Sequence, residues 1–144
     1  MAKRSPVLEQ FFRDMIGAIE ASDIGFIERT TSHEEGVVAI GSDPAEVAEG
    51  YDQIIPLMRS STPEGELGIR ARIDDVKAYE EGDTGWGHGR GRFETDGKSV
   101  DVRFTTVLHR EDGEWKVVQS HASIGVPNDR MFDPALEGGA GART

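Results

Sequence analysis

The sequence predicts an α+β fold in which N-terminal helices pack on one face of a cone-shaped, strongly curved antiparallel β-sheet. In the first 60 residues, apolar side chains recur at the spacing of amphipathic helices. From residue 67 onward, apolar and polar residues alternate in long runs, which is typical of strands with one buried face. Turn signals such as Asp112-Gly113 separate these runs, so neighbouring strands are expected to pair as hairpins.

The first helix begins at Ser5-Pro6, a cap residue followed by a proline suited to the first helical turn. Ala21-Ser22-Asp23 ends it and starts a short second helix. The first helix buries a stripe made of Leu8, Phe11, Phe12, Met15 and Ile19, and the second carries Ile24, Phe26 and Ile27.

A short apolar strand is expected over residues 37–40. Asp43-Pro44 then predicts the start of a third helix, because Asp43 can cap it and Glu46 stands where a capping box places an acid. The apolar face of that helix would carry Val47, Tyr51, Ile54, Ile55 and Met58.

Four strands follow, over residues 67–78, 86–94, 100–110 and 115–124. The apolar alternation of the first continues past Asp74-Asp75 only if one residue is inserted there, which indicates a β-bulge. A turn at Asp96-Gly97 pairs Glu94 with Ser99, Gly91 with Val102, Gly89 with Phe104 and Gly87 with Thr106.

This register gives the sheet two unlike faces. The inner face carries Gly87, Gly89, Gly91, Phe93, Val102, Phe104, Thr106 and Leu108, and the outer face Trp86, His88, Arg90, Arg92, Asp101, Arg103, Thr105 and His109. The inner glycines either let a helix approach closely and the sheet coil, or leave a cavity for a ligand. Because Trp86, Val107 and Val117 would be exposed outside, we expect part of the outer face to be buried in a homodimer.

Composition excludes several classes of function. The net charge of −11 and a pI of about 4.7 argue against nucleic acid as a partner, since such binding depends on neutralising phosphates. The chain has no cysteine, which excludes disulfides and thiolate sites and fits a cytoplasmic location. Acidic and basic residues interrupt the apolar N-terminal run, so we expect neither a signal peptide nor a membrane anchor.

Taken in order, these features resemble the SnoaL-like and ketosteroid-isomerase-like superfamily, which has the nuclear transport factor 2-like fold. The resemblance covers residues 1–127 as one domain and leaves 128–144 as a glycine-rich C-terminal tail, expected to be mobile or pinned by a partner. Trp115-Lys116-Val117-Val118 with His121-Ala122-Ser123 is similar to the uncharacterised SnoaL-like branch. The resemblance implies a conical pocket around the first helix and frequent dimers.

The resemblance also implies where a site would lie. Asp43 matches the carboxylate base of ketosteroid isomerases. Met15, however, stands where those enzymes place the tyrosine oxyanion donor, and Thr106, or alternatively Val107, where they place the acid donor. Steroid isomerisation is therefore disfavoured, since losing one such donor costs about 10²–10³ in rate. Kinase association domains of this superfamily carry pocket arginines where this chain has Thr106 and Ala122. The same alignment puts Val118, Ser120, Ala122 and Ile124 inside, and Gln119, His121 and Ser123 outside.

These observations predict a domain that binds a small, mostly apolar molecule, without cofactor or metal. The four histidines have no spacing typical of a metal site. One alternative is an isomerase, cyclase or dehydratase that uses Asp43 or a bulge aspartate as acid and base; another is a dimerisation module with a filled core. The ligand-lining residues would be Met15, Ile19, Tyr51, Phe104, Thr106, Ser120 and Ala122.

Overall fold

Three helices precede the long strands in the computed structural model, which describes residues 1–136. Helix α1 spans Pro6–Glu20, α2 spans Ile24–Thr30 and α3 spans Tyr51–Ser60. The Oγ of Ser5 caps α1 by accepting the Leu8 N–H at 3.2 Å. Asp23 caps α2 by accepting the Phe26 N–H at 3.2 Å. The segment Gly138-Gly139-Ala140-Gly141, for which mobility or a partner is predicted, lies outside the described residues.

One seven-stranded sheet carries the helices, with the order β1-β4-β5-β6-β7-β2-β3. The long strands are β4 (Arg70–Glu81), β5 (Thr84–Thr95), β6 (Lys98–Glu111) and β7 (Glu114–Ser123). The short ones are β1 (Lys3–Arg4), β2 (Val38–Ile40) and β3 (Val47–Glu49). The α+β class is confirmed, but the sheet is mixed rather than wholly antiparallel, because β2 runs parallel to β7 and covers its edge.

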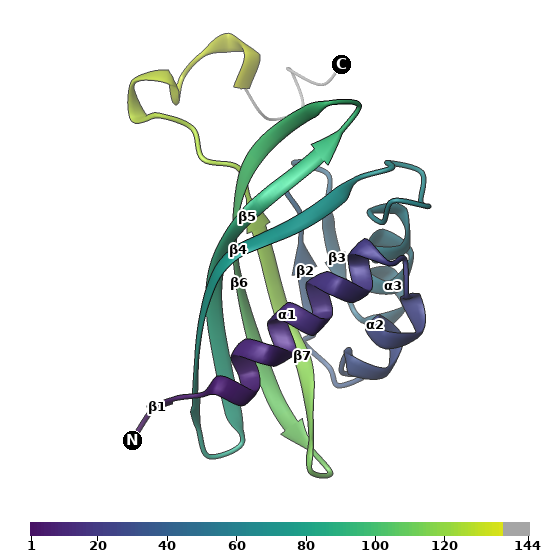
Figure 1. Ribbon diagram of the computed structural model, residues 1–144, viewed down its shortest axis with the longest axis vertical. Helices are drawn as coiled ribbons and strands as arrows, with labels where there is room; N and C mark the ends of the chain where they lie inside the picture. The colour runs from purple at the N-terminus through teal and green to yellow at the C-terminus, as the bar shows by residue number, and fades with distance from the viewer. Residues whose placement is uncertain (137–144) are drawn as a thin grey trace.

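The predicted pairing of β5 with β6 is confirmed at all four positions, from Glu94 opposite Ser99 to Gly87 opposite Thr106. The predicted bulge in β4 is also confirmed, since the register shifts between Ile73 and Asp75. Figure 1 shows the long strands bending around α1, which lies along their concave side.

The third helix begins seven residues later than the sequence predicts, at Tyr51 instead of Pro44. Asp43 lies instead in the turn between β2 and β3, where its carboxylate accepts the Ala45 N–H at 2.8 Å and its own N–H donates to Glu46 Oε1 at 2.9 Å. Gly50, with φ of 89°, redirects the chain into α3. Val47 is therefore an exposed strand residue and not part of a helix.

The alternation in β7 also departs from expectation. Its pairing with β6 shifts between Val107, opposite Gln119, and Leu108, opposite Val117, so that Val118 is the inserted residue. Such a bulge exchanges the two faces of a strand. Val117, expected outside, is therefore buried in the core beside Leu108.

Helix α1 divides into two halves with different surroundings. Its first half buries Leu8 and Phe12 completely against the sheet. Close approach is possible because β5 has glycine there: a Cβ on Gly85 would lie 2.4 Å from Leu8 and one on Gly87 2.1 Å from Phe12. Of the two explanations for the inner glycines, close helix packing holds at Gly87.

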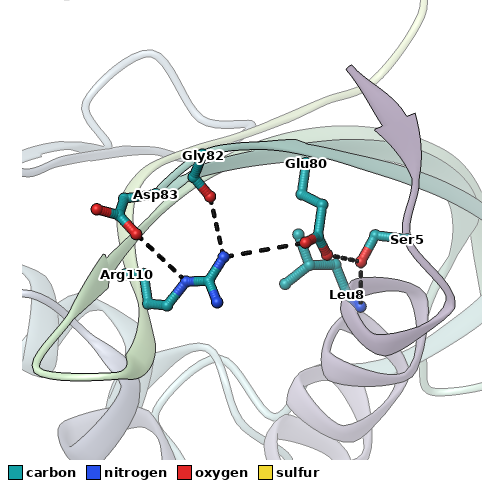
Figure 2. A network of polar contacts seen from close by, with 6 residues as sticks. All are labelled: Ser5, Leu8, Glu80, Gly82, Asp83 and Arg110. Carbon is teal, nitrogen blue, oxygen red and sulfur yellow. Dashed lines mark hydrogen bonds and ion pairs between the residues drawn. The ribbon is translucent and has the colours of Figure 1, made fainter. Parts of the chain in front are cut away.

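A polar network closes the end of the sheet where α1 begins (Figure 2). The Ser5 hydroxyl donates to Glu80 Oε2 at 2.5 Å, and the guanidinium of Arg110 lies 3.9 Å from Glu80 Oε1. Arg110 also donates to the Gly82 carbonyl at 2.9 Å and lies 3.5 Å from the Asp83 carboxylate. Its guanidinium stacks over the Trp115 ring at 4.5 Å, so side chains fill the space at this end of the sheet.

None of the helices within residues 1–136 has the length and apolar character required to cross a membrane.

Candidate functional site

A cavity of about 170 Å³ lies where the second half of α1 faces the sheet. Helix α3 and strand β2 close it on one side, and the inner faces of β4 to β7 close it on the other. Most of the lining is apolar; it includes Ile16, Ile27, Ala39, Ile40, Ile54, Leu57, Met58, Ala71, Phe93 and Val102.

Six of the seven residues expected to line a ligand site meet at this cavity. Met15 and Ile19 come from α1, Phe104 and Thr106 from β6, and Ser120 and Ala122 from β7. Tyr51 is the exception. Its hydroxyl donates to the Glu28 carbonyl at 3.3 Å and its ring stacks on His33 at 3.7 Å, because α3 begins at this residue and turns it toward α2.

Thr106 and Ser120 are two of the polar residues in the lining, which also include Thr30, Thr31, Ser42, Glu46, Ser61, Arg72 and His121. Thr106 and Ser120 lie directly opposite each other on β6 and β7. Within residues 1–136 neither side-chain hydroxyl forms a hydrogen bond, whereas the Thr31 hydroxyl donates to the Ile27 carbonyl at 2.7 Å and the Ser61 hydroxyl to the Leu57 carbonyl at 2.9 Å. Two neighbouring hydroxyls are thus available to a guest molecule.

Comparison with known proteins identifies the family of the chain. Residues 8–127 match the family model described as SnoaL-like domain. The chain belongs to the SnoaL-like family. No protein among those with curated descriptions matches it significantly.

Solved structures similar to this SnoaL-like domain share its fold at low identity. An NTF2-like protein of unknown function from Pseudomonas putida KT2440 has a TM-score of 0.71 at 17% identity, covering 88% of this chain and 93% of the other. An uncharacterised protein with a cystatin-like fold from Caulobacter vibrioides has a TM-score of 0.69 at 13% identity, covering 90% and 94%. A cystatin-like fold protein from Burkholderia xenovorans has a TM-score of 0.67 at 19% identity, covering 88% and 100%. These likenesses establish the NTF2-like fold of the SnoaL-like domain.

The inner glycines contribute less to the cavity than one sequence interpretation proposes. A Cβ on Gly89 would lie 2.5 Å from the Asp75 carbonyl oxygen, and one on Gly91 only 1.9 Å from the Arg72 carbonyl oxygen. Both positions therefore serve the close backbone contact at the β4 bulge. Of Gly87, Gly89 and Gly91, only Gly91 belongs to the cavity lining.

The aspartates considered as bases lie away from the cavity. Asp43, in its turn, and Asp74, at the bulge, are exposed, and neither belongs to the lining. Asp75 points outward and pairs with Arg90 at 2.8 Å, and this hydrogen bond lowers the pKa of Asp75 below its usual value of 3.8. A general base that works at neutral pH needs a raised carboxyl pKa. The lowered pKa of Asp75 therefore makes it unsuited to that role.

Sequence reasoning missed the contribution of β2 and the turn after it. Ala39, Ile40 and Glu46 line the cavity because β2 pairs with β7, a contact between segments about 80 residues apart that no local pattern reveals. Glu46 is the one carboxylate among the described lining residues, and its Oε1 accepts the Asp43 N–H. In residues 1–136 no three histidine, aspartate or glutamate side chains gather as metal ligands would.

Proposed function

We propose that this SnoaL-like domain binds a small, mostly apolar molecule in the cavity and orients it through Thr106 and Ser120. The supporting observation is an apolar cavity of about 170 Å³ with two adjacent hydroxyls that have no partner within the described chain. Such a combination of apolar walls and few polar groups is typical of ligand sites.

The volume limits the size of the guest. An apolar cavity of about 150 Å³ accommodates benzene, whereas sites for drug-sized molecules measure about 300–1,000 Å³. The cavity therefore suits a single ring or a short branched chain with one polar substituent. A fused-ring steroid would need more room.

A fluorinated phenol tests the proposal. We expect 4-fluorophenol to bind the wild-type protein in fluorine NMR titrations, and Ala122→Phe to abolish binding by filling the cavity. Ala21→Phe is the matched control, because Ala21 is exposed at the end of α1 and should leave binding intact. Equal binding by all three proteins, or none by the wild type, would refute the proposal.

A second comparison tests the role of the hydroxyls. Thr106→Val removes one hydroxyl at nearly constant volume. It should weaken the binding of 4-fluorophenol by the free energy of one hydrogen bond, about 0.5–1.5 kcal/mol, and leave the binding of fluorobenzene unchanged. Equal losses for the two probes would show that Thr106 acts only through packing.

The enzymatic alternative is less well supported, because Asp43 and Asp75 lie outside the cavity lining. An acid–base reaction there would have to use Glu46, which already accepts a backbone N–H, or His121, which also belongs to the lining. The alternative of a dimerisation module with a filled core is also less well supported, because the cavity measures about 170 Å³.

We also propose that two copies pair through the outer face of the sheet. Trp86 and Val107 are half-buried there, and the Trp86 ring stacks on Tyr79 at 6.3 Å. This leaves an aromatic surface that a second copy could cover. The absence of cysteine supports our further proposal of a cytoplasmic location.

A further inference from the structure

The segment after β7, residues 124–136, carries an unusual share of the exposed apolar surface. We call it the C-terminal arm. Phe132 is 91% exposed and Met131 54%, although both are residue types that folded proteins usually bury. Large exposed apolar groups close together mark a surface that meets a partner. Ile124, Val126 and Leu136 add to the same exposed set.

The C-terminal arm has its own local order. Two short 3₁₀ turns, Asn128–Arg130 and Pro134–Leu136, are held by backbone hydrogen bonds within the arm. Arg130 and Asp133 form an ion pair at 3.3 Å. In Figure 1 the arm extends from the end of β7 on the side of the sheet away from α2 and α3. An arm that is already ordered loses less entropy when it binds.

The outer face of the sheet holds a depression of about 370 Å³ next to the root of the arm. We call it the outer trough. Strand register arranges its side chains in two rows across β5, β6 and β7. One row is His88, Thr105 and His121, and the other is Arg90, Arg103 and Ser123.

The outer trough is positively charged on a chain whose net charge is −11. Arg90 and Arg103 lie directly opposite each other, an arrangement that is unfavourable without counter-charge. Asp75 pairs with Arg90, whereas Arg103 donates to the neutral Ser123 hydroxyl at 3.1 Å. Within the described residues no carboxylate lies at ion-pair distance from Arg103. Its guanidinium can therefore take an aromatic ring or a carboxylate from outside.

We propose that the C-terminal arm of one copy lies in the outer trough of a second copy, with Phe132 and Asp129 against the Arg103 side. The proposal rests on the outer-face homodimer above. The arm leaves the sheet beside its own trough, since a Cβ on Gly125 would lie 3.8 Å from the Arg103 guanidinium. Because the arm projects on the side where the paired copy would lie, a two-fold arrangement brings each arm to the partner's trough.

Sedimentation of the full chain over a dilution series tests this. Phe132→Ser should raise the dimer dissociation constant at least tenfold, as expected for a central aromatic contact. Val47→Ser is the matched control, because Val47 is 53% exposed on β3, at the far edge of the sheet, and should have no effect. Arg103→Glu should also weaken the dimer, and Arg103→Glu combined with Asp129→Arg should recover it.

The chain lacks cysteine, so single cysteines can map the contact. Asn128→Cys protein and ¹⁵N-labelled Thr105→Cys protein are mixed and oxidised. A covalent mixed pair, recognised by its mass, is the expected result. A single chain that carries both Asn128→Cys and Thr105→Cys is the comparison. If this chain forms a disulfide within one molecule and the mixture of single variants forms no mixed pair, the arm folds back on its own trough and the proposal is wrong.

The remaining outcomes separate the two proposals. A dimer that is unaffected by Phe132→Ser and Arg103→Glu would overturn the role of the arm and leave outer-face pairing intact. A chain that stays monomeric at every concentration would overturn both.

Discussion

Replacing Gly87 by alanine tests whether the inner glycines provide helix packing or open space. The added Cβ would lie 2.1 Å from Phe12 Cε2 and 2.8 Å from Phe12 Cζ, whereas carbon atoms in contact are about 3.5–4.0 Å apart. The Phe12 ring must therefore move by more than about 1 Å in fully buried surroundings. Overpacking costs typically about 1–3 kcal/mol, and the size of this clash leads us to expect the upper part of that range.

Urea unfolding followed by tryptophan fluorescence measures the loss in unfolding free energy. In a separate thermal scan, the melting temperature should fall by about 6–12 °C. Gly17→Ala is the control: Gly17 lies in α1, and beyond its chain neighbours and the helix's own backbone nothing lies within 4 Å of an added Cβ, so alanine should raise stability by about 0.5–1 kcal/mol. Phe12→Leu should recover part of the loss when combined with Gly87→Ala, because the two sites share one contact. A Gly87→Ala protein as stable as the wild type would refute the packing argument.

Three further predictions concern polar residues. The Arg90 hydrogen bond lowers the pKa of folded Asp75 below the usual 3.8, so its stabilising effect is complete above that value and is lost as the pH falls through the lowered folded pKa. Arg90→Gln should raise the Asp75 pKa in an NMR titration; an unchanged value would exclude the ion pair as its cause. Asp43→Asn should change stability by less than about 0.5 kcal/mol and leave 4-fluorophenol binding intact, since asparagine serves the same turn; lost binding would restore Asp43 as a site residue. Ser5→Ala should lower the free energy of unfolding in urea by at least about 1 kcal/mol, because α1 loses its cap and Glu80 loses the hydrogen bond from the Ser5 hydroxyl; no change would show that both contacts are dispensable.

The register of the long strands could be predicted because two-residue turns fix it. Asp96-Gly97 and Asp112-Gly113 have positive φ at both residues, which the tight hairpin turn requires and this residue pair supplies. Alternation of period two then places every later residue on one face or the other. The bulge in β4 was visible in the sequence because the alternation breaks there.

The bulge in β7 could not be predicted in the same way. Val117 and Val118 are both apolar, so the sequence does not show which of them is inserted, and only contact with Leu108 and the β2–β3 hairpin decides. Asp43-Pro44 was ambiguous for a similar reason, since the same residues begin helices and tight turns. As a result, the sheet side of the cavity was predicted well, and the side formed by β2 and α3 was not.

The division of α1 has a consequence for the range of guests that this architecture can accept. Phe12 forms an edge contact with Phe104, with ring centroids 6.4 Å apart, and the cavity begins one turn further along the helix at Met15. The packing of Phe12 on Phe104 therefore limits how far the cavity extends at this end. A smaller residue at position 12 would extend the cavity toward Arg110, but it would also remove the buried ring that packs the helix against the sheet. Selectivity for longer guests and resistance to unfolding are thus opposed at a single position.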